Sequence, residues 1–254
     1  MIASVQKAAK LLTIISDGKT KPLTLAELSE KSGINKSTCS HIISTLAKEG
    51  FVKRISHTKG YVLGPEIYCL SRFGKYDDEL VVLCHPILNW LQKKTGYAII
   101  LAVVEAGKKF TIDHIDTPER ILPCSYEIMP DDIYRTATGR IIMANMNLSE
   151  LKEVFEKNGL PPQNHWDGIT SFKSLSQELL KIDKKSVIKA SDKNNSGMTG
   201  YATAIYKNSK CVGAIGIAVQ SHETESDDFS AKEQDIRKYL LAARTEIGRR
   251  LKYS

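Results

Sequence analysis

Residues 24–50 read TLAELSEKSGINKSTCSHIISTLAKEG, and this stretch decides the fold of the N-terminal region. Thr24 is followed three positions later by Glu27, which is the capping-box spacing and predicts a short helix that begins after Thr24. Gly33 predicts the end of that helix and a turn, because glycine adopts the left-handed backbone conformation without strain. We therefore expect a short helix followed at once by a tight turn.

Asn35 can cap the next helix, and Gly50 suits its C-terminal stop. On a helical wheel this helix has one narrow apolar stripe, which predicts a single buried face. The stripe consists of Cys39, Ile42, Ile43 and Leu46. Two helices joined by a short turn, the second with one buried stripe, indicate a helix-turn-helix.

The opposite side of the second helix carries short polar side chains instead of the Glu/Lys pairs of an ordinary solvated helix. Hydroxyls, one imidazole and one lysine can approach a duplex closely and donate hydrogen bonds to phosphates or base edges. A solubilising surface with no partner is the alternative interpretation. The side chains of this helix that we predict to contact DNA are Lys36, Ser37, Thr38, Ser40, His41, Ser44 and Thr45.

Two short strands, over residues 51–55 and 60–63, follow around a polar tip and predict a hairpin. An amphipathic helix over residues 4–15 precedes the helix-turn-helix. The order helix, helix, turn, helix, hairpin predicts a winged helix-turn-helix. In the hairpin, Lys53, Arg54 and Lys59 are predicted to contact the DNA backbone or the minor groove, where they give affinity more than sequence choice.

The positive charge of the chain is concentrated in its N-terminal region. Residues 1–75 hold 12 Lys and Arg against five Asp and Glu, and the difference equals the +7 net charge of all 254 residues. Lysine and arginine attract a polyanion because binding releases condensed counterions. Double-stranded DNA is the predicted partner, and a basic surface without a partner is the alternative.

Beyond residue 78 the pattern predicts an α+β domain built on an antiparallel sheet. A long helix over residues 77–94, which Pro86 is expected to kink or restart, precedes the sheet. Strands are predicted over residues 97–104, 110–115, 200–206 and 211–219, and helices over residues 136–145, 148–157 and 174–184. A last helix has apolar residues at periods of three and four near the C-terminus.

The five cysteines are widely spaced and form no C-x-x-C pair, which argues against a disulfide framework or a zinc site. No apolar run is long enough to cross a bilayer. We therefore expect a soluble, cytoplasmic protein that has no metal or cofactor and no membrane partner.

An enzyme would need a nucleophile beside a base, such as Cys124 with His114, or a carboxylate pair, such as Asp113 with Asp116. His114 falls in a predicted strand, where a lone histidine is usually structural, so we do not expect catalysis. A second alternative is an architectural or partner-binding DNA-binding protein whose sensing pocket is vestigial.

Several short motifs follow one another along the chain. They are GINKST at residues 33–38, IISTLAKEGFV at 42–52, GYVLG at 60–64, LNWLQKKTG at 88–96, TATGR at 136–140 followed by MA at 143–144, and GAIGI at 213–217. In their order and spacing over about 240 residues, the sequence resembles the IclR family of bacterial transcriptional regulators.

The resemblance implies a winged helix-turn-helix domain over residues 1–64 and a linker helix over 65–77. It also implies a GAF-like domain over 78–254 that binds a small-molecule effector and forms homodimers or homotetramers on palindromic operators. Relatives often carry arginine in the recognition helix where this chain has His41, which changes the expected base preference.

The resemblance also identifies the effector positions as Ala137, Thr138, Ala190, Gly200, Gly216 and Ala218. Family members that bind small carboxylates have thiol, hydroxyl and acidic side chains at several of these places. In this chain these positions lack such donors. We expect them to leave space for a ligand and to expose backbone N–H groups to it. A buried carboxylate needs fixed donors. We therefore expect an effector that is larger or less charged than a two- or three-carbon acid.

Isothermal titration calorimetry of the full-length protein with glyoxylate and with pyruvate is predicted to give no tight binding, because the side-chain donors for a small carboxylate are missing. Tight binding of either acid would contradict this expectation.

Overall fold

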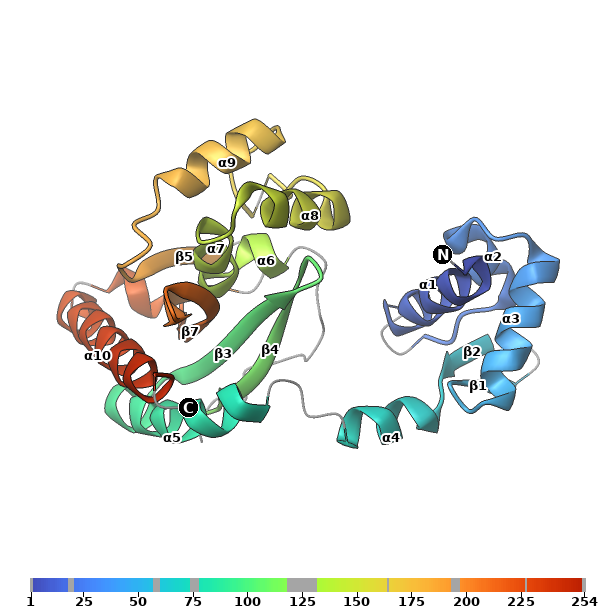
Figure 1. Cartoon of the computed structure of the whole chain (residues 1–254), viewed down its shortest axis with the longest axis horizontal. Coiled ribbons are helices and arrows are strands. Elements are labelled where there is room, and N and C mark those ends of the chain that lie inside the picture. Colours follow the sequence, from blue (N-terminus) through green and yellow to red (C-terminus); the bar gives the residue numbers. More distant parts are fainter. Residues whose placement is uncertain are drawn as a thin grey trace. The chain divides into compact units, whose positions relative to one another are not determined.

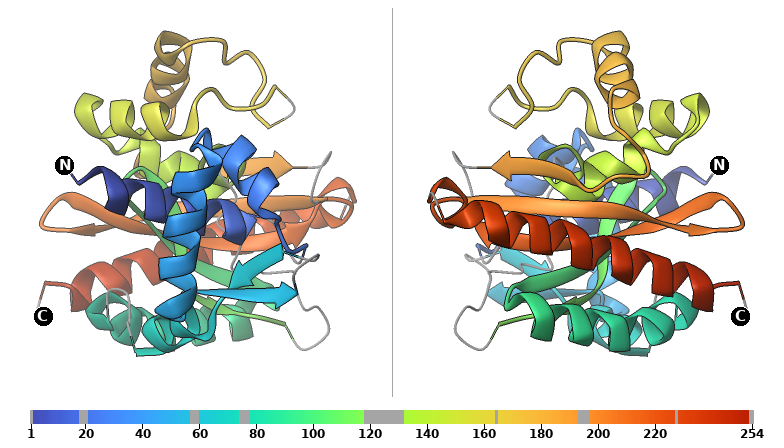
Figure 2. Two further views of the ribbon diagram at one scale, coloured as in Figure 1. Left: turned by 90° about the vertical axis from the view of Figure 1, so that its right-hand side faces the viewer. Right: turned by 90° about the vertical axis from the view of Figure 1, so that its left-hand side faces the viewer.

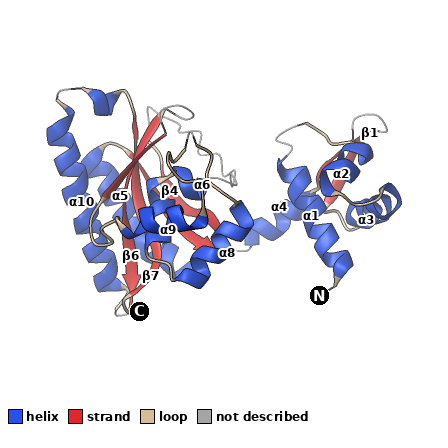
Figure 3. Ribbon diagram, turned by 90° about the horizontal axis from the view of Figure 1, so that it is seen from above, coloured by secondary structure: helices blue, strands red, loops and turns tan. Residues whose placement is uncertain are grey.

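The computed structural model describes residues 2–17, 21–56, 60–73, 78–117, 132–163, 165–192, 197–226 and 228–252. The chain divides into two compact units, residues 1–76 and residues 77–254. The first unit is mostly helical with one hairpin, and the second contains a larger sheet between helices (Figures 1 and 3).

The first unit has the predicted order of elements. They are α1 (Ala3–Asp17), α2 (Leu25–Ser32), α3 (Lys36–Lys48), β1 (Val52–Ser56), β2 (Gly60–Leu63) and α4 (Pro65–Phe73). β1 and β2 pair in antiparallel fashion, and an isolated bridge joins Leu23 to Tyr61 of β2. The winged helix-turn-helix expected from the sequence is therefore confirmed.

The caps predicted from the sequence position both helices of the motif. The Thr24 side chain accepts a hydrogen bond from the Glu27 amide, and Glu27 Oε2 accepts one from the Thr24 amide at 2.8 Å. Gly33 ends α2 with a φ of 66°. Asn35 Oδ1 accepts from the Thr38 amide at 2.8 Å and so begins α3. These contacts join residues close in sequence, so they fix the turn between α2 and α3 without help from long-range packing.

The end of α3 is joined to the start of α4 by a close backbone contact. The Glu66 amide donates to the carbonyl of Gly50 at 3.2 Å, and the Gly64 amide donates to Phe51 at 2.8 Å. A Cβ atom on Gly64 would lie 2.0 Å from the Gly50 oxygen, so no other residue fits there. The helix that leaves this unit is therefore anchored to the end of α3.

The second unit is an α+β domain. Its helices are α5 (Asp78–Thr95), α6 (Asp132–Arg135), α7 (Ala137–Ala144), α8 (Leu148–Asn158), α9 (Phe172–Leu180) and α10 (Phe229–Arg250), with a short 3-10 turn at Glu223–Glu225. Its strands are β3 (Ala98–Glu105), β4 (Lys108–Ile115), β5 (Ile188–Asp192), β6 (Met198–Lys207) and β7 (Lys210–Gln220). They form one antiparallel sheet in the order β4-β3-β7-β6-β5.

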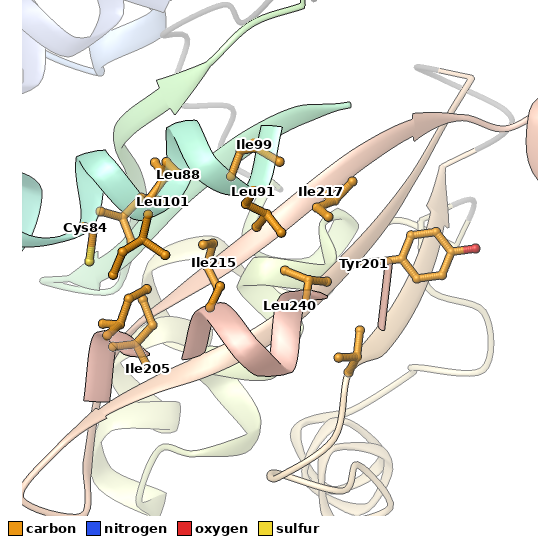
Figure 4. Close-up of a cluster of buried hydrophobic side chains, with 14 of the residues drawn as sticks. Cys84, Leu88, Leu91, Ile99, Leu101, Tyr201, Ile205, Ile215, Ile217 and Leu240 are labelled. Carbon is orange, nitrogen blue, oxygen red and sulfur yellow. The ribbon is translucent and has the colours of Figure 1, made fainter. Parts of the chain in front are cut away.

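Helices cover both faces of this sheet, and the two faces differ in side-chain size. α5 and α10 pack on one face, where large side chains such as Leu101, Ile215 and Ile217 form the main core (Figure 4). α7 packs on the other face, with α8 and α9 outside it (Figure 1). The strand residues under α7 are mostly alanine, so α7 lies close to the sheet.

Two tight turns set the registers of the hairpins. Ala106 and Gly107, between β3 and β4, both have positive φ values of 47° and 73°. Asn208 and Ser209, between β6 and β7, have φ values of 50° and 64°. Two consecutive left-handed residues match the right-handed twist of the paired strands, which is the conformation that two-residue hairpins prefer.

Three details differ from the sequence-based expectation. α5 continues through Pro86 without a restart, because the carbonyl that loses its hydrogen bond belongs to Val82, on the exposed side of the helix. α9 begins earlier than predicted, since Ser171 forms the cap with Ser174, and it ends at Leu180. The edge strand β5 and the short helix α6 are additional to the predicted elements.

A polar cluster ties α10 to the sheet. The hydroxyl of Tyr201, which is fully buried, donates to Glu233 of α10 at 2.9 Å (Figure 4 shows Tyr201). Arg237 and Lys189 also donate to the Glu233 carboxylate. Burial alone would raise the pKa of Glu233, but these hydrogen bonds outweigh burial and lower it. The cluster thus holds a carboxylate in its charged form at neutral pH.

Within the described part of the chain, no helix is both long and apolar enough to cross a membrane.

Replacing Gly64 with alanine is expected to destabilise the protein by at least about 1–3 kcal/mol, the usual cost of overpacking, because its Cβ would collide with the Gly50 carbonyl. Denaturant unfolding of the full-length protein measures the change. Gly248→Ala is the matched control, since a Cβ there meets no atom within 4 Å. Equal stability of the two variants would contradict the close approach at Gly64.

Candidate nucleic-acid interface and effector site

α3 presents its polar face to solvent and its apolar stripe to the core. Cys39 and Ile43 are buried, at 0% and 1% exposure, and they pack with residues of α1, α2 and β1. On the opposite side, Ser37, Ser40, His41 and Ser44 are all exposed, as is Lys36 at the start of the helix. The orientation of the helix derived from the sequence is therefore present in the fold.

The two threonines on the flanks of that face differ from the serines. Thr45 is exposed, but its hydroxyl donates to the carbonyl of His41 at 3.0 Å within the helix. Thr45 can therefore only accept further hydrogen bonds. Thr38 is half-buried and its amide is used by the Asn35 cap. The hydroxyls of the exposed serines and the imidazole of His41 are groups that can both donate and accept hydrogen bonds.

The basic residues of the hairpin do not share one face. In the register of the two strands, Arg54 lies opposite Tyr61, and Lys53 lies opposite Val62. Successive residues of a strand point to opposite sides, so Lys53 and Arg54 point away from each other. Lys59 lies outside the described residues. The prediction from sequence groups these three residues, and alternation along β1 separates two of them.

The predicted effector positions come together on the α7 face of the sheet. Ala190 of β5 pairs with Gly200 of β6, and Gly200 pairs with Ala218 of β7. A Cβ on Gly200 would lie 3.3 Å from the Cβ of Ala137, at the start of α7. These four positions therefore lie within one small patch between the sheet and α7.

Gly216 and Thr138 lie next to this patch and touch each other. A Cβ on Gly216 would lie only 2.7 Å from Thr138 Cγ2 and 3.2 Å from the carbonyl of Tyr201. The room expected at Gly216 is thus filled by the Thr138 methyl group. A side-chain donor at position 216 does not fit here unless Thr138 moves.

Thr136 and Thr138 hold the start of α7 in a fixed geometry. Thr136 Oγ1 accepts from the Gly139 amide at 3.2 Å and from the Thr138 hydroxyl at 3.3 Å. Arg140 then ties α7 to its surroundings, with Nε donating to the Tyr134 carbonyl and the guanidinium 4.3 Å from the Trp166 ring centre. Thr136 is not among the residues predicted from the sequence, although its position before an apolar helix is the signal for a cap.

Of the residues considered for catalysis, the two described carboxylates belong to separate pairs. Asp113 Oδ2 lies 2.8 Å from Nδ1 of His85 on α5, whereas Asp116 Oδ2 lies 3.4 Å from Nε2 of His114. The two carboxylates are therefore held by different histidines. Cys124 lies outside the described residues. Among those that are described, no three His, Cys, Asp or Glu side chains form a group that could hold a metal ion.

Two family models match the chain and together cover most of it. The model described as "Bacterial transcriptional regulator IclR C-terminal" matches residues 77–251, and the "IclR helix-turn-helix domain" model matches residues 4–56. Among curated proteins, the chain is 20% identical over 210 residues to the transcriptional repressor IclR of Escherichia coli. That match covers 81% of this chain and 75% of the repressor.

Solved structures share the fold over nearly the whole chain. A putative IclR transcriptional regulator from a Silicibacter species has a TM-score of 0.76 at 20% identity and covers 98% of this chain and 96% of its own. An IclR homologue from Microbacterium hydrocarbonoxydans, solved as a complex with 4-hydroxybenzoate, has a TM-score of 0.67 at 16% identity. It covers 97% of this chain and 100% of its own.

A double-mutant cycle tests the packing of α7 on β7. Gly216→Ala alone is expected to destabilise the protein by roughly 1–3 kcal/mol, because Thr138 is buried and its χ1 angle is stiff. Thr138→Ser removes the colliding methyl group but keeps the hydroxyl, so it should recover much of the loss in the double variant. Denaturant unfolding measures all four proteins, and strictly additive effects would contradict the contact.

Proposed function

The chain belongs to the IclR family of bacterial DNA-binding transcriptional regulators, and we propose that it binds a palindromic operator as a dimer or tetramer. One observation carries this proposal. α3 exposes serines and His41 over a buried apolar stripe, in the part of the chain that holds all of the excess positive charge. Such a helix can enter the major groove and read base edges.

In the proposed complex, one α3 helix from each of two protomers enters successive major grooves about 34 Å apart. Ser37, Ser40, His41 and Ser44 face the bases, and Lys36 with the flanking threonines lies nearer the phosphates. His41 has one ring nitrogen that donates and one that accepts when neutral, so it distinguishes base edges. Lys53, Arg54 and Lys59 of the hairpin supply most of the salt-dependent affinity.

The remaining parts of the chain take the following roles in this proposal. Residues 1–64 bind DNA in the cytoplasm, and residues 78–254 form a GAF-like domain for effector binding and oligomerisation. Residues 65–77 form the helix that links these two domains. The contact between the Gly50 carbonyl and the Glu66 amide supports a direct mechanical role for the linker helix. A shift of that helix would move the end of α3 with it.

We propose that the effector binds beside the start of α7, next to Ala137, Thr138, Ala190, Gly200, Gly216 and Ala218. The small apolar residues of this patch favour a ligand with apolar surface over a small acid whose charge would need side-chain donors. The 4-hydroxybenzoate in the complex of the Microbacterium homologue is a carboxylate too, but it is larger than a three-carbon acid and carries an apolar ring. An effector changes DNA affinity only if it binds the operator-competent and operator-incompetent states unequally.

A DNA-binding protein that senses no metabolite is the second candidate. The filled space at Gly216 favours it, because the Thr138 methyl group occupies volume where a ligand would otherwise lie. Thermal unfolding of the full-length protein with and without candidate ligands separates the two candidates, since a ligand that binds the folded state raises its stability.

Selection of bound fragments from genomic DNA tests the proposal directly. The wild-type protein should enrich a two-fold symmetric motif. His41→Ala should change the bases that are preferred, whereas Lys59→Ala should weaken binding about equally on all sequences and reduce the salt slope by about one. His222→Ala, an exposed histidine in the second unit, is the control and should leave the motif unchanged. An unchanged motif with His41→Ala would contradict the role of His41 in reading bases.

A further inference from the structure

The hairpin of the first unit has two unequal faces. Val52 of β1 is 2% exposed and belongs to the helical core, and Tyr61 and Leu63 of β2 pack against that core. Arg54 lies two residues beyond Val52 on the same strand and pairs with Tyr61, so it shares this face. Lys53 pairs with Val62 and lies on the face turned away from the helices.

Tyr61, whose ring lies beside the guanidinium of Arg54, is held in place by backbone hydrogen bonds. Its amide donates to the Leu23 carbonyl at 2.8 Å, and its carbonyl accepts from the Leu23 amide at 3.0 Å. Gly60 allows this approach, since a Cβ there would lie 2.4 Å from the Leu23 oxygen. The backbone of Tyr61 is therefore held between β1 and the segment that enters α2.

The guanidinium of Arg54 lies 5.7 Å from the centre of the Tyr61 ring, within the range of a cation–π contact. The side chain of Arg54 is exposed, so the ring restrains it without burying it. β1 packs against α3, and the left panel of Figure 2 shows the hairpin beside that helix. An oriented, exposed cation thus lies on the side of the hairpin that carries the recognition helix.

We propose that Arg54, positioned by Tyr61, is the residue of the hairpin that reads the minor groove, and that it selects narrow A·T-rich sequence beside the bases contacted by α3. This inference rests on the proposed function. A narrow minor groove has an enhanced negative potential that attracts arginine. Guanidinium enters it more readily than ammonium because it is more weakly hydrated. Lys53, on the other face, contributes only general attraction to phosphates.

Lys53 and Arg54 therefore have different roles, although they are alike in charge and exposure. Both are basic, exposed and adjacent in β1. If both served only to attract phosphates, their removal would have the same effect on every DNA sequence. If Arg54 instead reads the minor groove, the loss of affinity on its removal depends on the sequence of the flanking DNA. The loss on removal of Lys53 does not.

Selection of full-length protein variants on a random-sequence duplex library tests this. Wild type should enrich A·T pairs at positions flanking the central contacts. Arg54→Lys keeps the charge but should lower the preference for A·T flanks over G·C flanks at least about fivefold, the lower end of what one specified base pair contributes. Lys53→Ala, the matched control, should keep the wild-type flanking preference.

Tyr61→Leu tests the positioning role, because it leaves Arg54 in place and removes the ring. The flanking preference should fall by about two- to fivefold, the factor that an exposed cation–π contact contributes. Tyr61→Phe keeps the ring and should retain the preference. If Tyr61→Leu fails to fold in a thermal melt, the Phe variant and Arg54→Lys still decide the question.

The outcomes are distinct. Loss of the A·T preference in Arg54→Lys with retention in Lys53→Ala supports the proposal. Retention of the preference in Arg54→Lys, or an equal loss in Lys53→Ala, overturns it. A wild-type motif without any flanking A·T preference also overturns it while leaving the proposed function intact. Failure of the wild type to bind any duplex would instead contradict the proposed function.

Discussion

The burial of one narrow stripe of α3 is the constraint on which DNA recognition by this chain depends. Cys39 and Ile43 are almost fully buried against α1, α2 and β1, and this packing fixes the rotation of the helix about its axis. Because the stripe is narrow, the rest of the helix surface is available for polar side chains that are not needed for packing. A rotation that buried Ser40 or His41 would place polar groups in the core and expose apolar ones, and both changes cost free energy.

In the second unit, the packing of the helices depends on a different property, which is the size of the side chains on the two faces of the sheet. Large residues face α5 and α10 and form the main core, while alanine and glycine face α7 and bring that helix close. The same glycines that the family resemblance assigns to effector binding are therefore also packing residues. Gly216 shows this most clearly, since Thr138 fills the volume beside it. At the proposed effector site, a bound ligand would compete with helix packing for the same small volume and so shift the position of α7.

Much of the fold could be predicted from the sequence, because its signals are local. The capping box at Thr24, the Asn35 cap and the apolar period of α3 all appear within a few residues. β5 was not predicted, since the apolar–polar alternation of Ile188–Asp192 covers only four residues, from Ile188 to Ser191, and its pairing with β6 is not visible in the local pattern. The contact of Gly216 with Thr138 depends on how β7 and α7 pack, which no local pattern contains. The separation of Lys53 from Arg54 was within reach of the sequence, since alternation along a strand places neighbours on opposite sides.

The most direct measurement is an NMR titration of the full-length protein with a selected duplex, compared with a duplex of the same composition and scrambled sequence. We expect the selected duplex to shift the His41 imidazole signals and the resonances of Ser37, Ser40 and Ser44, and the scrambled duplex to shift them less. Buried residues of the same helix, such as Ile43, should move little. Specific shifts confined to another surface of the protein, with the polar face of α3 unchanged, would contradict the central claim that this face reads DNA.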